Sequence, residues 1–223
     1  VIIFHFHTQL APLLPGDWAA PLEKGYLMVD LFFVLSGFVM YHVYGGLFKL
    51  TTRLRHILTF MGARLARIYP LHLVTLSIVT AIAIPVLLMP SVDPFFKVVY
   101  DFTAIPSHFL LLQAMGTHHE ATWNTPSWSI SVEWWTYALF PFIVSFLAKT
   151  GRWSRWLMAA GILAGYLVIM FHFQPAFWAA RWRQFHVPGN ITYPVHIIDI
   201  ITGPAILRCL CGFCWGMLVY EGY

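Results

Sequence analysis

The sequence has 223 residues, of which 59% are hydrophobic, 17% aromatic and only 10% charged. A soluble domain has about 45–50% apolar and about 25% charged residues, so this chain carries too few charges to cover a water-exposed surface. The net charge of +4 comes mostly from short basic runs between apolar segments, which indicates cytoplasmic loops of a membrane protein and argues against nucleic-acid binding.

The first half of the chain predicts two complete membrane spans, each needing about 20 apolar residues. The first apolar run, 1–14, is shorter and starts without Met or a basic flank, so we expect the chain to begin inside a helix. The first complete span is predicted at 27–47, which makes 15–25 an external loop. The basic stretch 49–67 predicts a cytoplasmic loop, and 68–89 predicts the next span.

The second half predicts spans at 130–148 and 157–173, and one or two further helices within 191–223. The apolar segment 95–115 is interrupted by polar residues and a proline, so it either spans or is re-entrant. If the basic cluster 149–155 is cytoplasmic, then 116–128 is external and the segment 95–115 does not cross the membrane. The charge rule therefore favours the re-entrant arrangement.

Together these segments predict an all-α, polytopic transmembrane bundle of six to eight helices, forming a single domain over residues 1–223. The three cysteines, Cys209, Cys211 and Cys214, lie in one apolar run. A zinc site needs a fourth ligand and a polar setting, so we expect these cysteines to be small buried apolar residues and expect no metal.

Ionisable groups inside spans are costly, so each is a candidate functional residue. His5 and His7 lie two apart in the first segment and face different directions on a helix; a neutral imidazole suits a general base. Asp30 could orient such a histidine, as the carboxylate of a hydrolase triad does. The alternatives are an interhelical hydrogen bond for the histidine, helix capping for Asp30 and close helix packing for Ser36.

Two further pairs have helical spacing. Arg64 and Arg67 lie three apart on one helix face, where they either anchor the helix or bind a phosphorylated donor through their planar guanidinium groups. Glu133 and Tyr137 lie four apart on one face, and the interfacial aromatic belt does not explain a carboxylate there. Polar and aromatic residues rim the entrance of this span: Asn124, Ser127 and Trp128.

Four motifs occur in one order along the chain: VIIFH, MVDLFFVLSGFVM, ARLARIYPLH and NTPSWSISVEWWTYALFP. In this order they resemble the acyltransferase-3 family of bacterial integral-membrane O-acyltransferases. The run RCLCGFCWGMLVY is similar to a later helix of that family, with an arginine shortly before Phe-x-x-Gly. The family's core is longer, so the chain resembles its N-terminal two-thirds, incomplete at both ends.

The resemblance implies roles for the candidate residues. The family pattern of a basic residue, ten residues and a histidine selects His5, and it places the basic partner before Val1. His5 is then the general base or relays the acyl group, while Asp30 or Glu133 sets its protonation. The arginine pair is implied to hold the phosphates of acyl-CoA, a co-substrate rather than a tightly bound cofactor. The candidate substrate-binding residues are Ser36, Asn124, Ser127, Trp128 and Tyr137.

The implied activity is transfer of an acyl group, most simply acetyl, from acyl-CoA to a hydroxyl of a glycan, glycolipid or glycosylated metabolite. The expected location is the lipid bilayer of a bacterial cytoplasmic (inner) membrane. Two alternatives stay open: a transporter or channel with an ionisable pathway, and an inactive truncated relative. The order of the motifs and the lack of paired broken helices favour the enzyme.

Overall fold

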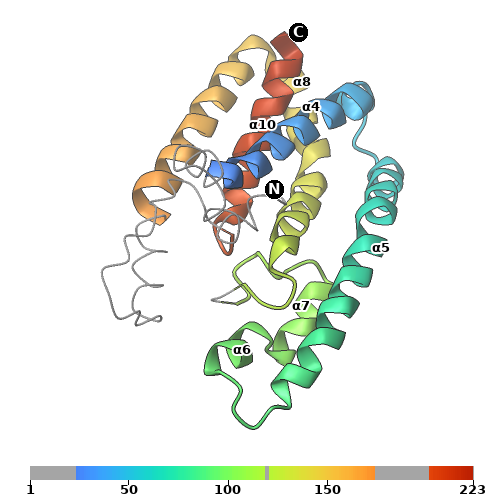
Figure 1. Cartoon of the computed structure of the whole chain (residues 1–223). Coiled ribbons are helices and arrows are strands. Elements are labelled where there is room, and N and C mark those ends of the chain that lie inside the picture. Colours follow the sequence, from blue (N-terminus) through green and yellow to red (C-terminus); the bar gives the residue numbers. More distant parts are fainter. Residues whose placement is uncertain (1–23, 119–120, 174–200, 223) are drawn as a thin grey trace, which may run out of the picture.

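The computed structural model describes residues 24–118, 121–173 and 201–222 (Figure 1). Within these ranges all regular structure is helical, and five segments are long and apolar enough to cross a membrane. The all-α transmembrane prediction is therefore confirmed. The elements are η2 (Lys24–Tyr26), α4 (Leu27–Leu50), α5 (Leu54–Leu87), α6 (Pro94–Val99), η3 (Phe102–Ala104), α7 (Ile105–Phe109), η4 (Thr125–Ser127), α8 (Trp128–Val168), η5 (Ile169–Phe173) and α10 (Ala205–Gly222).

The connection between α4 and α5 is much shorter than predicted. The basic stretch 49–67 was expected to form a loop, but only residues 51–53 lie outside the helices. Residues 54–67 contain no proline and one glycine, so nothing in their sequence ends a helix. At 34 residues, α5 is about 51 Å long and exceeds the roughly 30 Å hydrocarbon layer. The arginine pair therefore projects from a continuous helix.

Among its described residues, the segment between α5 and α8 contains no helix long enough to cross a membrane. Its helices α6 and α7 have six and five residues, too short to span, and they lie beside one end of α5 (Figure 1). The Nε2 atom of His72 lies 3.0 Å from the carbonyl oxygen of His108, and the Tyr69 hydroxyl donates to the carbonyl of Phe109 at 2.9 Å. The re-entrant reading of 95–115 is the one that fits these elements.

The long helix α8 is a hairpin of two spans. Gly151 has φ 62° and ψ −147°, a conformation that glycine adopts readily and other residues rarely, and it reverses the direction of the chain. The two arms match the spans predicted at 130–148 and 157–173, the second continuing into η5.

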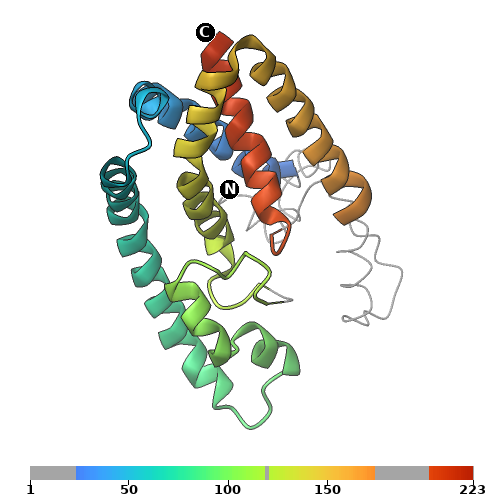
Figure 2. The same cartoon turned by 180° about the vertical axis from the view of Figure 1, so that it is seen from behind.

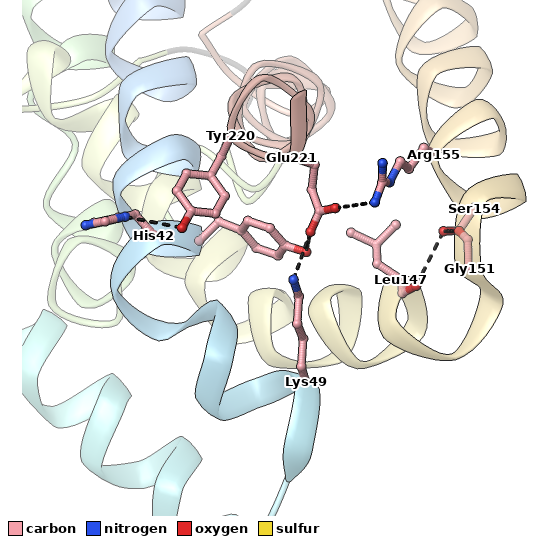
Figure 3. Close-up of polar contacts among 9 residues, drawn as sticks. His42, Lys49, Leu147, Gly151, Ser154, Arg155, Tyr220 and Glu221 are labelled. Atoms are coloured by element: carbon pink, nitrogen blue, oxygen red, sulfur yellow. Dashed lines mark hydrogen bonds and ion pairs between the residues drawn. The ribbon is translucent and has the colours of Figure 1, made fainter. Parts of the chain in front are cut away.

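One residue of each basic cluster, Lys49 and Arg155, lies beside Glu221 of α10 (Figure 3). Glu221 forms ion pairs with Lys49 at 2.9 Å and with Arg155 at 2.7 Å, and it accepts a hydrogen bond from Tyr41. Lys49 follows the first span and Arg155 follows the turn at Gly151, so the two clusters share a side, as the charge rule predicted. We refer to this side as the basic end. Figures 1 and 2 show α6 and α7 at the opposite end.

Helix α10 packs against both α4 and the first arm of α8. Its Gly216 lies so close to α4 that an added Cβ would be 1.9 Å from the Val34 carbonyl oxygen, and a Cβ on Gly37 would be 1.9 Å from that of Phe213. Small residues permit this backbone contact. On the same helix Cys209 and Cys211 are buried, as predicted, whereas Cys214 is half-buried. The main core consists of Met40, Tyr41, Phe48, Phe60, Tyr137, Phe140, Val144, Leu147, Phe213 and Met217.

Candidate active site

A cleft of about 490 Å³ lies between α4, α5 and the first arm of α8. Apolar residues of α4 form much of its wall, and polar side chains enter it from all three helices. Five residues selected from the sequence line this one cleft: Ser36, Arg64, Arg67, Glu133 and Tyr137. Segments up to 101 positions apart in the sequence are thus joined at a single polar site within the membrane-spanning bundle.

Three of these residues form a chain of hydrogen bonds. The Tyr137 hydroxyl donates to Glu133 Oε1 at 2.7 Å, one helical turn away on α8. The Ser36 Oγ on α4 lies 2.9 Å from the same hydroxyl. We call this Ser36–Tyr137–Glu133 chain the relay. It connects two helices and ends at a carboxylate.

The arginine pair forms the cationic part of the cleft. Arg64 donates to the Tyr44 hydroxyl at 3.3 Å, contacts Met40 Sδ at 3.6 Å, and its guanidinium lies 5.5 Å from the centre of the Tyr44 ring. The buried Nε of Arg64 has no hydrogen-bond partner among the described residues. Arg67 is exposed. Because Met40 and Tyr44 lie on the half of α4 nearer Lys49, the cationic part faces the basic end.

Asp30 does not line the cleft. Its carboxylate accepts two hydrogen bonds from Arg208 of α10, from Nε at 2.9 Å and from Nη2 at 2.7 Å. The Arg208 side chain is fully buried and its guanidinium lies 5.2 Å from the centre of the Trp128 ring. Asp30 is therefore held in a bidentate ion pair, and Trp128 packs on the cation of that pair. The sequence contained Arg208 in the last motif, but it gave no sign of this partner.

Asn124 and Ser127 also lie away from the cleft lining. Asn124 donates to Thr75 Oγ1 at 2.9 Å, and Ser127 accepts from Gln113 Nε2 at 3.2 Å. These bonds attach the residues just before α8 to α5 and to the segment between α7 and η4. His5 lies outside the described residues, so its role as general base stays a prediction.

Comparison with known proteins gives three findings. The family model described as "Acyltransferase domain" matches residues 1–223. The chain is 32% identical over 149 residues to the acyltransferase MdmB of Streptomyces mycarofaciens, a match covering 66% of this chain and 35% of MdmB. It is 47% identical over 58 residues to Protein 2 in the picA locus of Rhizobium radiobacter, covering 26% of this chain and 29% of that protein. No solved structure matches the chain.

Proposed function

The chain belongs to the acyltransferase-3 family, and we propose that the full-length protein transfers an acyl group, most simply acetyl, from acyl-CoA to a hydroxyl of a glycan, glycolipid or glycosylated metabolite. The observation that carries this proposal is the joining of two arginines, a carboxylate and two hydroxyls in one cleft between α4, α5 and α8. Since the chain spans only 35% of the length of MdmB, the activity is proposed for the whole protein.

The donor would enter from the basic end. Guanidinium groups bind phosphate oxygens in pairs, and Arg64 and Arg67 line the cleft on the side of this end. The charge rule assigns the basic end to the cytoplasm, where acyl-CoA is found. The thioester would then extend from the arginines toward the relay.

We assign proton transfer to His5, acting as general base on the acceptor hydroxyl, because a neutral imidazole is the side chain best suited to accept a proton near neutral pH. Of the two acids proposed to set its protonation, Glu133 lines the cleft, whereas Asp30 is paired with Arg208. Glu133 is therefore the acid that we assign to this role.

The assignment of His5 is tested by acyl transfer from labelled acetyl-CoA in the purified full-length protein. His5→Ala should lower the rate by about 10²–10⁴-fold, the usual contribution of a general base. His7→Ala is the matched control, since His7 is two residues away and is expected to face elsewhere. If His5→Ala transfers acyl groups as fast as His7→Ala, the assignment of the base is wrong.

Donor binding is tested separately by thermal unfolding in detergent. A ligand that binds the native state stabilises it, by about 2.7 kcal/mol at 100 times its dissociation constant. Acetyl-CoA should raise the unfolding temperature of the wild type, and replacing both Arg64 and Arg67 by alanine should remove this shift. Arg53→Ala is the control, because Arg53 is an exposed arginine outside the cleft. An unchanged shift in the double variant would exclude the arginine pair as the donor site.

A further inference from the structure

The relay has a direction, because its atoms differ in what they can donate. An ionised carboxylate only accepts hydrogen bonds, so Tyr137 donates its one O–H to Glu133. The Ser36 hydroxyl must then donate to the Tyr137 oxygen, 2.9 Å away. Hydrogen bonds in such a chain polarise one another, most strongly where the local dielectric is low. The oxygen of Ser36 is therefore the electron-rich end of the relay.

The bond from Ser36 to Tyr137 joins two helices. Thr136 also donates to another helix, to Cys209 Sγ at 3.3 Å, and Ser131 donates to the carbonyl of Leu111 outside its helix. A hydroxyl within a helix commonly bonds to the carbonyl four residues earlier. Four threonines here do so: Thr59, Thr75, Thr136 and Thr150. Ser36 bonds across to another helix instead, and its side chain lines the cleft.

Two features of the surroundings suit Ser36 to chemistry. The next residue, Gly37, is packed against the backbone of Phe213, so the backbone beside Ser36 cannot shift toward α10. The cleft is also the one lined by Arg64 and Arg67, the residues assigned to the donor's phosphates, so a bound donor lies in the same cleft as Ser36. A positioned hydroxyl with an adjacent proton acceptor, in the cleft that takes the donor, provides the parts of a covalent acyl-transfer site.

We propose that Ser36 is a nucleophile that carries the acyl group as an ester between donor and acceptor, with Tyr137 as the positioning residue that joins it to Glu133. This inference rests on the proposed function, because it takes acyl-CoA as the donor.

In the first step the Ser36 oxygen attacks the thioester carbonyl. The C–S bond breaks, an ester forms on Ser36, and CoA leaves as its thiolate. The Ser36 proton passes to Tyr137 while Tyr137 gives its own proton to Glu133. In the second step the acceptor hydroxyl attacks this ester and gives its proton to His5. Ser36 regains a proton from Glu133 through Tyr137. The CoA thiolate takes its proton from water as it leaves in the first step, and His5 returns a proton to water in the second, so every group ends as it began.

The first step needs no acceptor, so it can be tested while the acceptor is unidentified. The full-length protein is mixed with isotopically labelled acetyl-CoA, quenched in acid, digested and mapped by mass spectrometry. We expect a burst of one CoA thiol per protein and an acetyl group on Ser36, in the peptide region MVDLFFVLSGFVM.

Variants separate chemistry from folding. Ser36→Ala should lose the label, and Ser36→Cys should retain it as a thioester that hydroxylamine releases. Tyr137→Phe should slow labelling by about 10²–10⁴-fold with its unfolding temperature retained, which a purely structural role does not predict. Ser77→Ala is the control, since Ser77 is exposed on α5 outside the cleft.

The outcomes distinguish this inference from the function on which it rests. If acyl transfer proceeds while Ser36 stays unlabelled, or if Ser36→Ala transfers at the wild-type rate, Ser36 is excluded as the carrier of the acyl group. The proposed acyltransferase activity is retained in both cases. A label on His5 in place of Ser36 also excludes Ser36 as the carrier. If wild-type protein neither releases CoA nor takes up a label, the proposed donor is wrong, and the proposal that Ser36 carries the acyl group is rejected as well. A label on Ser36 without transfer to any offered hydroxyl supports the carrier and rejects the acceptor class.

Discussion

Replacing Gly216 by alanine is expected to force α10 away from α4. An added Cβ would lie 1.9 Å from the Val34 carbonyl oxygen and 2.7 Å from the Phe38 backbone nitrogen. Ordinary van der Waals contact begins at 3.4 Å, so the helices must separate by about 1.5 Å, the difference between the two distances. Backbone atoms on both sides leave no flexible side chain to yield.

The expected cost follows from two opposing effects. Overpacking costs about 1–3 kcal/mol, and more where nothing can move. Alanine also favours a helix over glycine by about 1 kcal/mol, which partly offsets that cost. We expect Gly216→Ala to lower the free energy of unfolding by about 2 kcal/mol. Gly46→Ala is the matched control, because Gly46 lies within α4 with open space around it, and there alanine should be neutral or stabilising.

The assay is reversible unfolding of the full-length protein in detergent, followed by circular dichroism for wild type and both variants. The reasoning predicts opposite signs for the two glycine-to-alanine changes. If Gly216→Ala proves as stable as Gly46→Ala, the close contact of α4 with α10 is not present in the folded protein.

Three further changes should affect stability. Arg208→Met should cost about 3–5 kcal/mol of unfolding free energy by leaving the Asp30 carboxylate without its cation, and adding Asp30→Leu should recover most of that loss; failure to recover would mean that Asp30 has another structural role. Burial, and next the charge of His72, lower the pKa of His108 to about 4 from 6.5, so the folded protein binds fewer protons than the unfolded one. The contribution of His108 to the free energy of unfolding should be fully present above pH 6.5 and should fall by about 3 kcal/mol toward pH 4. In thermal unfolding measured across that range, His108→Gln should flatten this pH dependence. Glu221→Gln should cost less than about 1 kcal/mol, with a smaller effect in high salt, because its ion pairs are partly exposed; a larger, salt-independent loss would contradict this.

The spans were predictable because length and hydropathy alone decide whether a helix can cross a membrane. The start of α5 was not predictable, because its basic residues mark the boundary of the membrane and not the boundary of the helix. Charged side chains end the apolar stretch, but the helix continues through them because arginine is a good helix former. The non-crossing segment 95–115 was favoured by the charge rule, which compares whole loops and is insensitive to the details of α6 and α7.

For the cleft, spacing within one helix was informative. The i, i+3 arginines and the i, i+4 pair of Glu133 and Tyr137 each share a face, and the structure brings both faces to one cleft. Contacts between distant segments were not readable from one sequence. Asp30 was a candidate either to orient a histidine or to cap its helix, and nothing in the sequence indicated that it pairs with Arg208, 178 residues away.

That distance has a consequence for biosynthesis. A ribosome adds about 5–20 residues per second, so Asp30 is synthesised roughly 10–35 s before Arg208. During that interval α4 carries an aspartate whose arginine partner has not yet been synthesised. Because Asp30 lies in the first turn of α4, its carboxylate is close to the end of the helix, where water can hydrate it until α10 arrives. Locking α10 between α4 and α8 must be a late event in assembly, completed only after residues 205–222 have left the ribosome.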